Sequence, residues 1–176
     1  GFQGKRQEYI LELFDLQDRS RLLALEGADL IVWPESGYPY AFSRLARSDW
    51  PSSDGRQVQR GFTTPLIFGA VTVAPWRDGP RPYPYNTALL LDRDGRIAGS
   101  FDKIFLLMFG EYIPGLETFP WLRKILPEQA GHFARGKDVT TFPFATADGR
   151  VWRLAPMICY EDIMPSLGRQ IGKLRP

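Results

Sequence analysis

The sequence predicts an α/β fold in a single domain that spans residues 1–176. Three observations predict it: a helical pattern opens the chain, short apolar runs typical of strands follow it, and turn signals separate these runs. With 44% hydrophobic and 24% charged residues, the composition is that of an ordinary globular domain rather than of a disordered segment.

Residues 5–25 are predicted to form the first helix. Its apolar residues share one face and its charged residues lie outside that face: Ile10, Leu13, Phe14 and Leu16 on the first, and Glu8, Glu12, Asp15 and Arg19 on the second. Gly27 ends the helix, as glycine often does. The next run, Leu30–Trp33, is short and entirely apolar, which predicts a central strand buried on both faces.

Residues 36–60 are rich in turn residues and are predicted to be irregular. Four aromatic residues lie in this segment: Tyr38, Tyr40, Phe42 and Trp50. Two interpretations stay open. The segment is either a surface loop anchored by its rings, or a functional element, namely a lid or an apolar wall for a ligand.

Five further runs are predicted to be strands: Leu66–Val73, Tyr85–Leu91, Arg96–Phe101, Val139–Phe144 and Val151–Cys159. Asp92–Gly95 is a tight-turn signal, so the second and third of these runs form a hairpin. A short helix with a loop is predicted over 116–138, and another helix after Pro165. The apolar block 104–109 is either plain core or a wall that contacts an acyl chain or lipid.

Several function classes are excluded by composition. The net charge is only +2 and no run of Lys and Arg occurs, so nucleic acid is not an expected partner. One cysteine forms no internal disulfide, and one histidine, His132 in a predicted loop, is too few for a zinc site. No apolar run reaches the roughly 18 residues of a membrane span. The chain opens and closes without a signal peptide or a complete element, so we expect a piece of a longer protein.

Three apolar runs lead to reactive groups, namely Glu35, Lys103 and Cys159. Because chemistry in α/β sheets gathers beyond strand ends, we expect these groups to meet, about 3–5 Å apart. A Cys159 thiolate is a nucleophile, and a nearby Glu35 carboxylate could take its proton. Lys103, helped by the backbone N–H of Tyr160, could hold the negative charge on an attacked carbonyl oxygen. Such a set predicts acyl transfer through a thioester.

Each of these residues also has an ordinary interpretation. A lone cysteine is usually a small buried hydrophobe. Taken singly, Glu35 reads as a solvated loop carboxylate, Lys103 as a surface charge at a hairpin end, and Glu111 as a turn residue.

Four stretches carry a resemblance to a known family: Val32–Ser36, Tyr85–Ala88, Phe101–Lys103 continued by Phe109–Pro114, and Ile158–Ile163. Together they resemble the nitrilase (carbon–nitrogen hydrolase) superfamily and, within it, the apolipoprotein N-acyltransferase family. Phe109–Pro114 is the most discriminating stretch, because soluble nitrilases usually carry the lysine without it.

The resemblance implies a nitrilase-like α-β-β-α sandwich, truncated here at both ends. It implies that Glu35 is the general base, Lys103 the oxyanion stabiliser and Cys159 the nucleophile. Glu111 is then a second active-site carboxylate, while Tyr160 and Glu161 support the nucleophile. No cofactor and no metal are implied.

The resemblance further implies transfer of a fatty acyl group from a phospholipid to the amino-terminal cysteine of a diacylated lipoprotein. It places the domain on the periplasmic face of the bacterial inner membrane, anchored by parts of the protein not present in this sequence. Two other functions stay open: a soluble amidase of the same superfamily that hydrolyses a carbon–nitrogen bond, and a binding module that has kept the fold without catalysis.

Overall fold

The computed structural model describes residues 2–78, 82–115, 121 and 133–176, with side chains from Glu8 onward. Its helices are α1 (Phe2–Leu25) and α2 (Pro165–Leu174). Its strands are β1 (Ile31–Val32), β2 (Phe42–Ser43), β3 (Leu66–Val73), β4 (Tyr85–Leu91), β5 (Ile97–Asp102), β6 (Phe142–Ala145) and β7 (Val151–Leu154).

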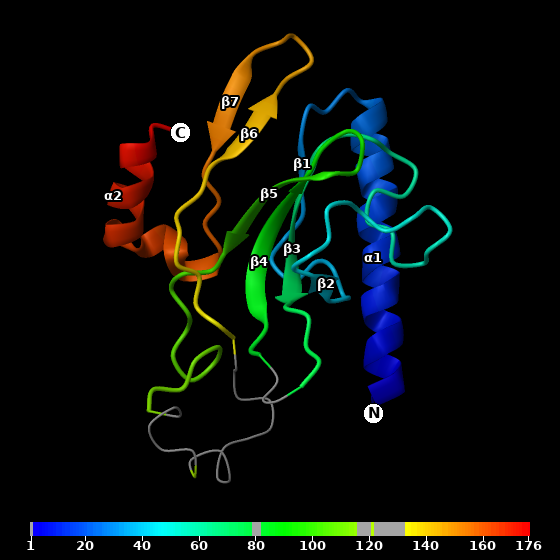
Figure 1. Ribbon diagram of the computed structural model, residues 1–176. Coiled ribbons are helices and arrows are strands. Elements are labelled where there is room, and N and C mark those ends of the chain that lie inside the picture. Colours follow the sequence, from blue (N-terminus) through cyan, green and yellow to red (C-terminus); the bar gives the residue numbers. More distant parts are fainter. Residues whose placement is uncertain (1, 79–81, 116–120, 122–132) are drawn as a thin grey trace.

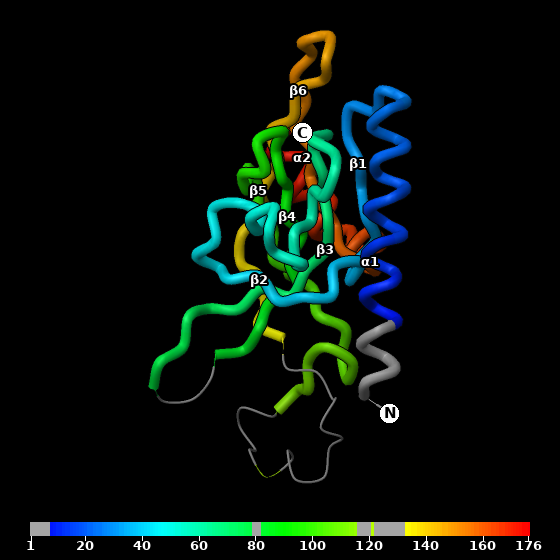
Figure 2. The backbone as a smooth tube through the Cα atoms, turned by 90° about the vertical axis from the view of Figure 1, so that its right-hand side faces the viewer, coloured from blue at the N-terminus to red at the C-terminus, as the bar shows by residue number. Residues whose placement is uncertain are grey.

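Five strands form one sheet, in which β1, β3, β4 and β5 neighbour one another in that order and β2 also pairs with β3. β1 and β2 run parallel to β3, whereas β4 and β5 follow as antiparallel neighbours. β6 and β7 form a separate hairpin. α1 lies along one side of the five-stranded sheet, and the hairpin and α2 lie on the other side (Figure 1). In Figure 2 the hairpin projects beyond the end of that sheet.

The sheet has two apolar faces because successive side chains of a strand point to opposite sides. On β3, Leu66 and Phe68 belong to the larger cluster of buried residues, which α1 covers through Leu13. Ile67 packs instead against a smaller cluster on the opposite face, which includes Phe142 of β6. The core therefore lies in two layers, one on each side of β3 and β4.

α1 confirms the predicted first helix and begins three residues earlier than predicted. Its buried face differs from the prediction, because Gln17 and Ser20 are almost fully buried while Phe14 is 41% exposed. Both polar side chains form hydrogen bonds: Gln17 Nε2 donates to Gln57 O at 2.8 Å, and Ser20 Oγ accepts from Trp33 Nε1 at 2.9 Å. The buried Gln17 Oε1 has no hydrogen-bond partner among the described residues.

β1 departs from the prediction of a strand buried on both faces. Ile31 and Trp33 are buried, but Val32 is 64% exposed. The reason is tertiary: β1 is an edge strand, and Val32 lines an open groove rather than a packed layer.

Residues 36–60 are irregular as predicted, apart from the short strand β2. Tyr38 and Phe42 are buried, and their rings lie 5.6 Å and 5.7 Å from the ring of Phe68. The inward packing of these rings supports a loop anchored on the core. It does not contradict the interpretation as a ligand wall, because Tyr38 also lines a cavity.

The C-terminal strands are shorter than predicted. β7 ends at Leu154, and Cys159 opens a 3-10 turn, η2 (Cys159–Ile163), instead of ending the strand. Pro156 has no N–H to donate, which disfavours continued strand pairing. α2 begins at Pro165, as predicted. His132 and most of the helix predicted over 116–138 fall outside the described residues. Within the described part of the chain, no helix is long and apolar enough to cross a membrane.

Candidate active site

Glu35 is placed by the turn that follows β1. The Trp33 N–H still bonds to Ile67 O at 2.8 Å, and the chain then turns across β3 through Ser36, whose φ is +60°. A Cβ added to Gly69 of β3 would lie 3.0 Å from Ser36 N and 3.1 Å from Glu35 Cα. Only glycine at this position lets the backbone of Glu35 pass so close to the sheet.

Lys103 follows β5 directly, and its backbone N–H donates to Asn86 O of β4 at 2.8 Å. Its side chain is only 2% exposed, so the interpretation as a surface charge is wrong. The ammonium donates to Glu35 Oε1 at 3.1 Å and to Glu111 Oε1 at 3.0 Å. The separation from Glu35 falls within the predicted range.

Glu111 lies in the turn after Lys103, and this turn holds it in place. Its Oε2 accepts the Leu107 N–H at 3.0 Å, while its Oε1 accepts from Lys103 and from Asn86 Nδ2, at 3.0 Å each. Burial opposes ionisation, but these hydrogen bonds outweigh it and lower the pKa of Glu111. Burial likewise opposes the charge of Lys103, yet the two carboxylates raise its pKa. The pair is therefore ionised at neutral pH.

Cys159 is exposed and takes a left-handed φ of +55°, a conformation that is uncommon for a residue with a side chain. Its exposure argues against the buried-hydrophobe interpretation. A cavity of about 380 Å³ is lined by Cys159 together with Glu35, Lys103 and Glu111. The acid, the amine and the thiol of the sequence prediction therefore face one space.

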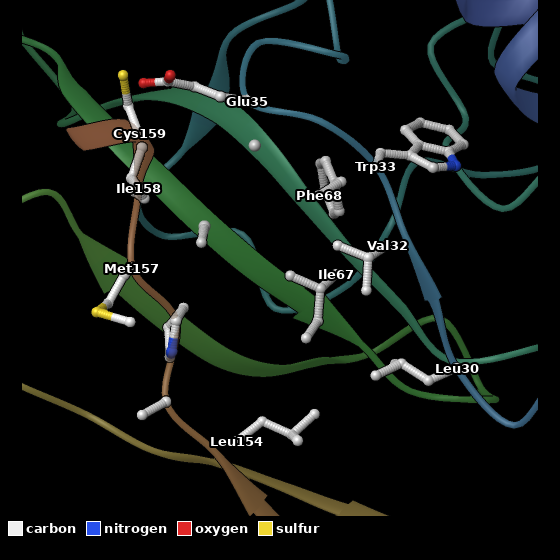
Figure 3. Close-up of a pocket in the computed structure, with 14 residues that line it drawn as sticks. Leu30, Val32, Trp33, Glu35, Ile67, Phe68, Leu154, Met157, Ile158 and Cys159 are labelled. Carbon is white, nitrogen blue, oxygen red and sulfur yellow. The ribbon is translucent and has the colours of Figure 1, made fainter. Parts of the chain in front are cut away.

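A second cavity, an apolar groove of about 360 Å³, begins at the same place. Figure 3 shows the Cys159 sulfur and the Glu35 carboxylate at one end of this groove, with Val32, Ile67 and Leu154 along it.

Glu161 fastens the thiol-bearing turn to the segment after Lys103, although its own side chain is completely buried. Its Oε1 accepts the N–H groups of Ile104 and Phe105 at 2.7 Å and 2.9 Å, and its Oε2 accepts the Ile158 N–H at 2.9 Å. Three donors compensate the buried carboxylate.

Tyr160 makes a second connection between the same two segments. Its hydroxyl donates to Leu106 O at 2.9 Å, and its ring centroid lies 5.8 Å from Lys103 Nζ. Glu161 and Tyr160 thus contact the backbone and the lysine around the thiol rather than the open cavity.

The structure brings together all six residues that the sequence pointed to, and it adds Asn86. This side chain donates to Glu35 Oε1 at 2.7 Å and to Glu111 Oε1 at 3.0 Å. The available signal was the only asparagine of the chain, next to Thr87 at the start of a strand that continues as an apolar run, Ala88–Leu91. In the described ranges, no cluster of three or more His, Cys, Asp or Glu residues is arranged to hold a metal ion.

Comparison with known proteins shows a match to the carbon–nitrogen hydrolase family over residues 7–174. A Chlorobaculum tepidum protein named apolipoprotein N-acyltransferase is 30% identical over 172 residues, which cover 90% of this chain and 32% of that protein. A Brucella suis protein of the same name is 37% identical over 141 residues, covering 78% and 24%. The chain thus spans about a quarter to a third of the length of these curated relatives.

Among solved structures, an N-terminal amidase with an Asn-Glu peptide superposes with a TM-score of 0.50 at 17% identity. The match covers 90% of this chain and 37% of the amidase. At this identity the likeness concerns the fold alone. With the family match, it confirms the expected fold class, a nitrilase-like α/β sandwich.

Proposed function

Because this chain belongs to the carbon–nitrogen hydrolase family, we propose that the whole protein is a lipoprotein N-acyltransferase that works through a Cys159 thioester. The observation that carries the proposal is the pocket that Glu35, Lys103 and Cys159 share, in a chain 30–37% identical to proteins named apolipoprotein N-acyltransferase. The acyl donor is a phospholipid, the acceptor is the amino-terminal cysteine of a diacylated lipoprotein, and the site faces the periplasm at the bacterial inner membrane.

The apolar block 104–109 supports a lipid donor. Leu106 is buried, but Leu107, Met108 and Phe109 are 50%, 63% and 71% exposed. Phe109 takes a left-handed φ of +65°, and Leu107 also lines the pocket that holds Lys103. Adjacent exposed apolar side chains at the rim of a pocket suit an apolar partner, which a phospholipid provides.

In the first half of the reaction, Glu35 takes the proton of the Cys159 thiol, and the thiolate attacks the ester carbonyl of the phospholipid. Lys103 and the Tyr160 N–H hold the resulting oxyanion, and one such donor typically lowers a barrier by about 3 kcal/mol. The carbon–oxygen bond of the ester breaks, Glu35 returns its proton to the leaving alkoxide, and lysophospholipid departs. The acyl group stays on Cys159 as a thioester.

In the second half, the α-amine of the lipoprotein attacks the thioester carbonyl. Glu35 accepts a proton from the amine, and the same donors hold the oxyanion again. The carbon–sulfur bond breaks, and the thiolate recovers the proton from Glu35. The products are an amide on the lipoprotein and the free thiol of Cys159.

The test is mass spectrometry of the full-length protein incubated with phospholipid, as wild type and as Cys159→Ser. We expect an acyl adduct on Cys159 that is absent from the variant and is discharged by a peptide with an N-terminal diacylated cysteine. Discharge by water, with no effect of the amine, would indicate the amidase. No adduct, together with ordinary alkylation kinetics of Cys159, would indicate the binding module.

A further inference from the structure

Asn86 lies between the two carboxylates of the candidate site. The residue is 8% exposed, and its Nδ2 donates to Glu35 Oε1 at 2.7 Å and to Glu111 Oε1 at 3.0 Å. An ionised carboxylate can only accept hydrogen bonds, so the amide turns its nitrogen toward both neighbours and its oxygen away. Both N–H groups of the amide are thereby used.

The same two oxygens also accept the ammonium of Lys103, at 3.1 Å from Glu35 and 3.0 Å from Glu111. Lys103 and Asn86 therefore close a ring with the two carboxylates, in which each Oε1 receives one charged and one neutral donor. One ammonium balances only one of two carboxylates. Asn86 supplies two further hydrogen-bond donors to the carboxylates without adding a second positive charge to the pocket.

The consequence concerns which oxygen of Glu35 can take a proton. Oε1 is occupied by Asn86 and Lys103, whereas no described residue donates a hydrogen bond to Oε2. Figure 3 shows the carboxylate at the end of the groove where the Cys159 sulfur lies. A carboxylate held through one oxygen leaves the other oxygen oriented for transfer.

We propose that Asn86 is a positioning residue, which fixes the Glu35 carboxylate so that its second oxygen receives the proton of the Cys159 thiol. The proposal rests on the proposed role of Glu35 as the base. Asn86 has a structural part as well, because its carbonyl accepts the Lys103 N–H and it pairs with Val71 of β3. These backbone contacts do not depend on the side chain, so substitutions separate the two roles.

Titratable groups reach this pocket from four segments: Glu35 and Tyr38 after β1, Lys103 after β5, Glu111 in the next turn, and Cys159 in η2. The substitution Asn86→Asp keeps the shape of the side chain and places a third carboxylate opposite Glu35 and Glu111. Like charges at this distance favour protonation of the group. The acid limb of the pH–rate profile for acylation therefore moves up by about one unit or more.

The experiment measures single-turnover acylation of Cys159 by phospholipid across pH, in the full-length protein. Asn86→Ala is expected to slow acylation about a hundredfold, the usual effect of a misplaced catalytic group. Asn86→Asp shifts the acid limb as stated. Ser53→Asp adds the same charge on an exposed loop and should leave both the rate and the limb unchanged.

A wild-type rate and an unshifted acid limb in folded Asn86→Ala and Asn86→Asp would overturn the proposal. If Asn86→Asp does not fold, the rate of Asn86→Ala decides. If the wild type forms no acyl adduct, the proposed function fails instead. The pH dependence of Cys159 alkylation by iodoacetamide still reports on Asn86 in that case, because an unchanged dependence in the variants contradicts its role without any lipid.

Discussion

The two faces of the five-stranded sheet are covered in different ways. Toward α1, Phe68 packs among the rings of Trp33, Tyr38 and Phe42, and all four are buried. On the opposite face the buried cluster is smaller, and a groove of about 360 Å³ runs along it to Cys159. The closed face holds the strands in place, while the open face carries a groove that leads to Glu35 and Cys159. One side of β3 and β4 therefore holds the packed core that keeps the strands in place, and the other side holds the groove through which a ligand could reach Cys159.

The largest expected effect would test the closed face. Phe68→Ala removes a fully buried ring from the aromatic cluster and should cost about 3–5 kcal/mol of unfolding free energy, measured in urea. The neighbouring Ile67→Ala lies on the groove side and is only partly buried, so it should cost about half as much or less. Equal losses at these two adjacent positions would contradict the difference between the faces.

The second prediction concerns Glu161, which connects the thiol-bearing turn to the segment after Lys103. Glu161→Gln turns an N–H toward at least one of the backbone donors that the carboxylate now accepts, and should cost about 2–3 kcal/mol of stability. It should also change the alkylation rate of Cys159, because the thiol-bearing turn loses at least one of the hydrogen bonds by which Glu161 holds Ile104, Phe105 and Ile158 together. Asp162→Asn, at the next and exposed position, should alter the stability by less than about 0.5 kcal/mol. Similar effects of the two substitutions would refute the fastening role.

The third prediction concerns Gly69, where β3 contacts the turn that carries Glu35. Gly69→Ala pushes the backbone of Glu35 away from β3 and should lower the acylation rate about tenfold, with a smaller effect on folding. Gly168→Ala makes the same chemical change in open space on α2 and should raise stability by up to about 1 kcal/mol with the rate unchanged. An unaffected rate in Gly69→Ala would show that Glu35 does not need this close approach.

The smallest expected effect is the pH dependence of folding at the open face. The pKa of Glu111 is lowered in the folded protein, so its hydrogen bonds stabilise the fold above the ordinary glutamate pKa and lose that contribution as the pH falls through the lowered value. The pKa of Lys103 is raised, so its contribution is lost only as the pH rises through that higher value. The melting temperature of wild type should fall on acidification more steeply than that of Glu111→Gln. Parallel plots of melting temperature against pH for the two proteins would exclude Glu111 as a source of the acid-induced loss of stability.

The strands nearest the site were predictable from local patterns. Leu66–Val73 and Tyr85–Leu91 were predicted with the bounds that the structure gives, because apolar runs between turn signals depend on neighbouring residues alone. The stretches around Glu35, Lys103 and Cys159 likewise carried the family resemblance in short motifs. Motifs name residues, but they do not say which atoms face one another.

Local patterns along the chain therefore predict the α/β class, most of the strands and the candidate acid, amine and thiol. The folded structure was needed to show that Val32 is exposed, that Gln17 and Ser20 belong to the core, and that Asn86 joins two carboxylates. Each of these outcomes depends on a neighbour distant in the chain, such as Glu35, 51 residues from Asn86. A strand or helix pattern repeats over a few residues, whereas the partner of a buried polar group is known only once the chain has folded.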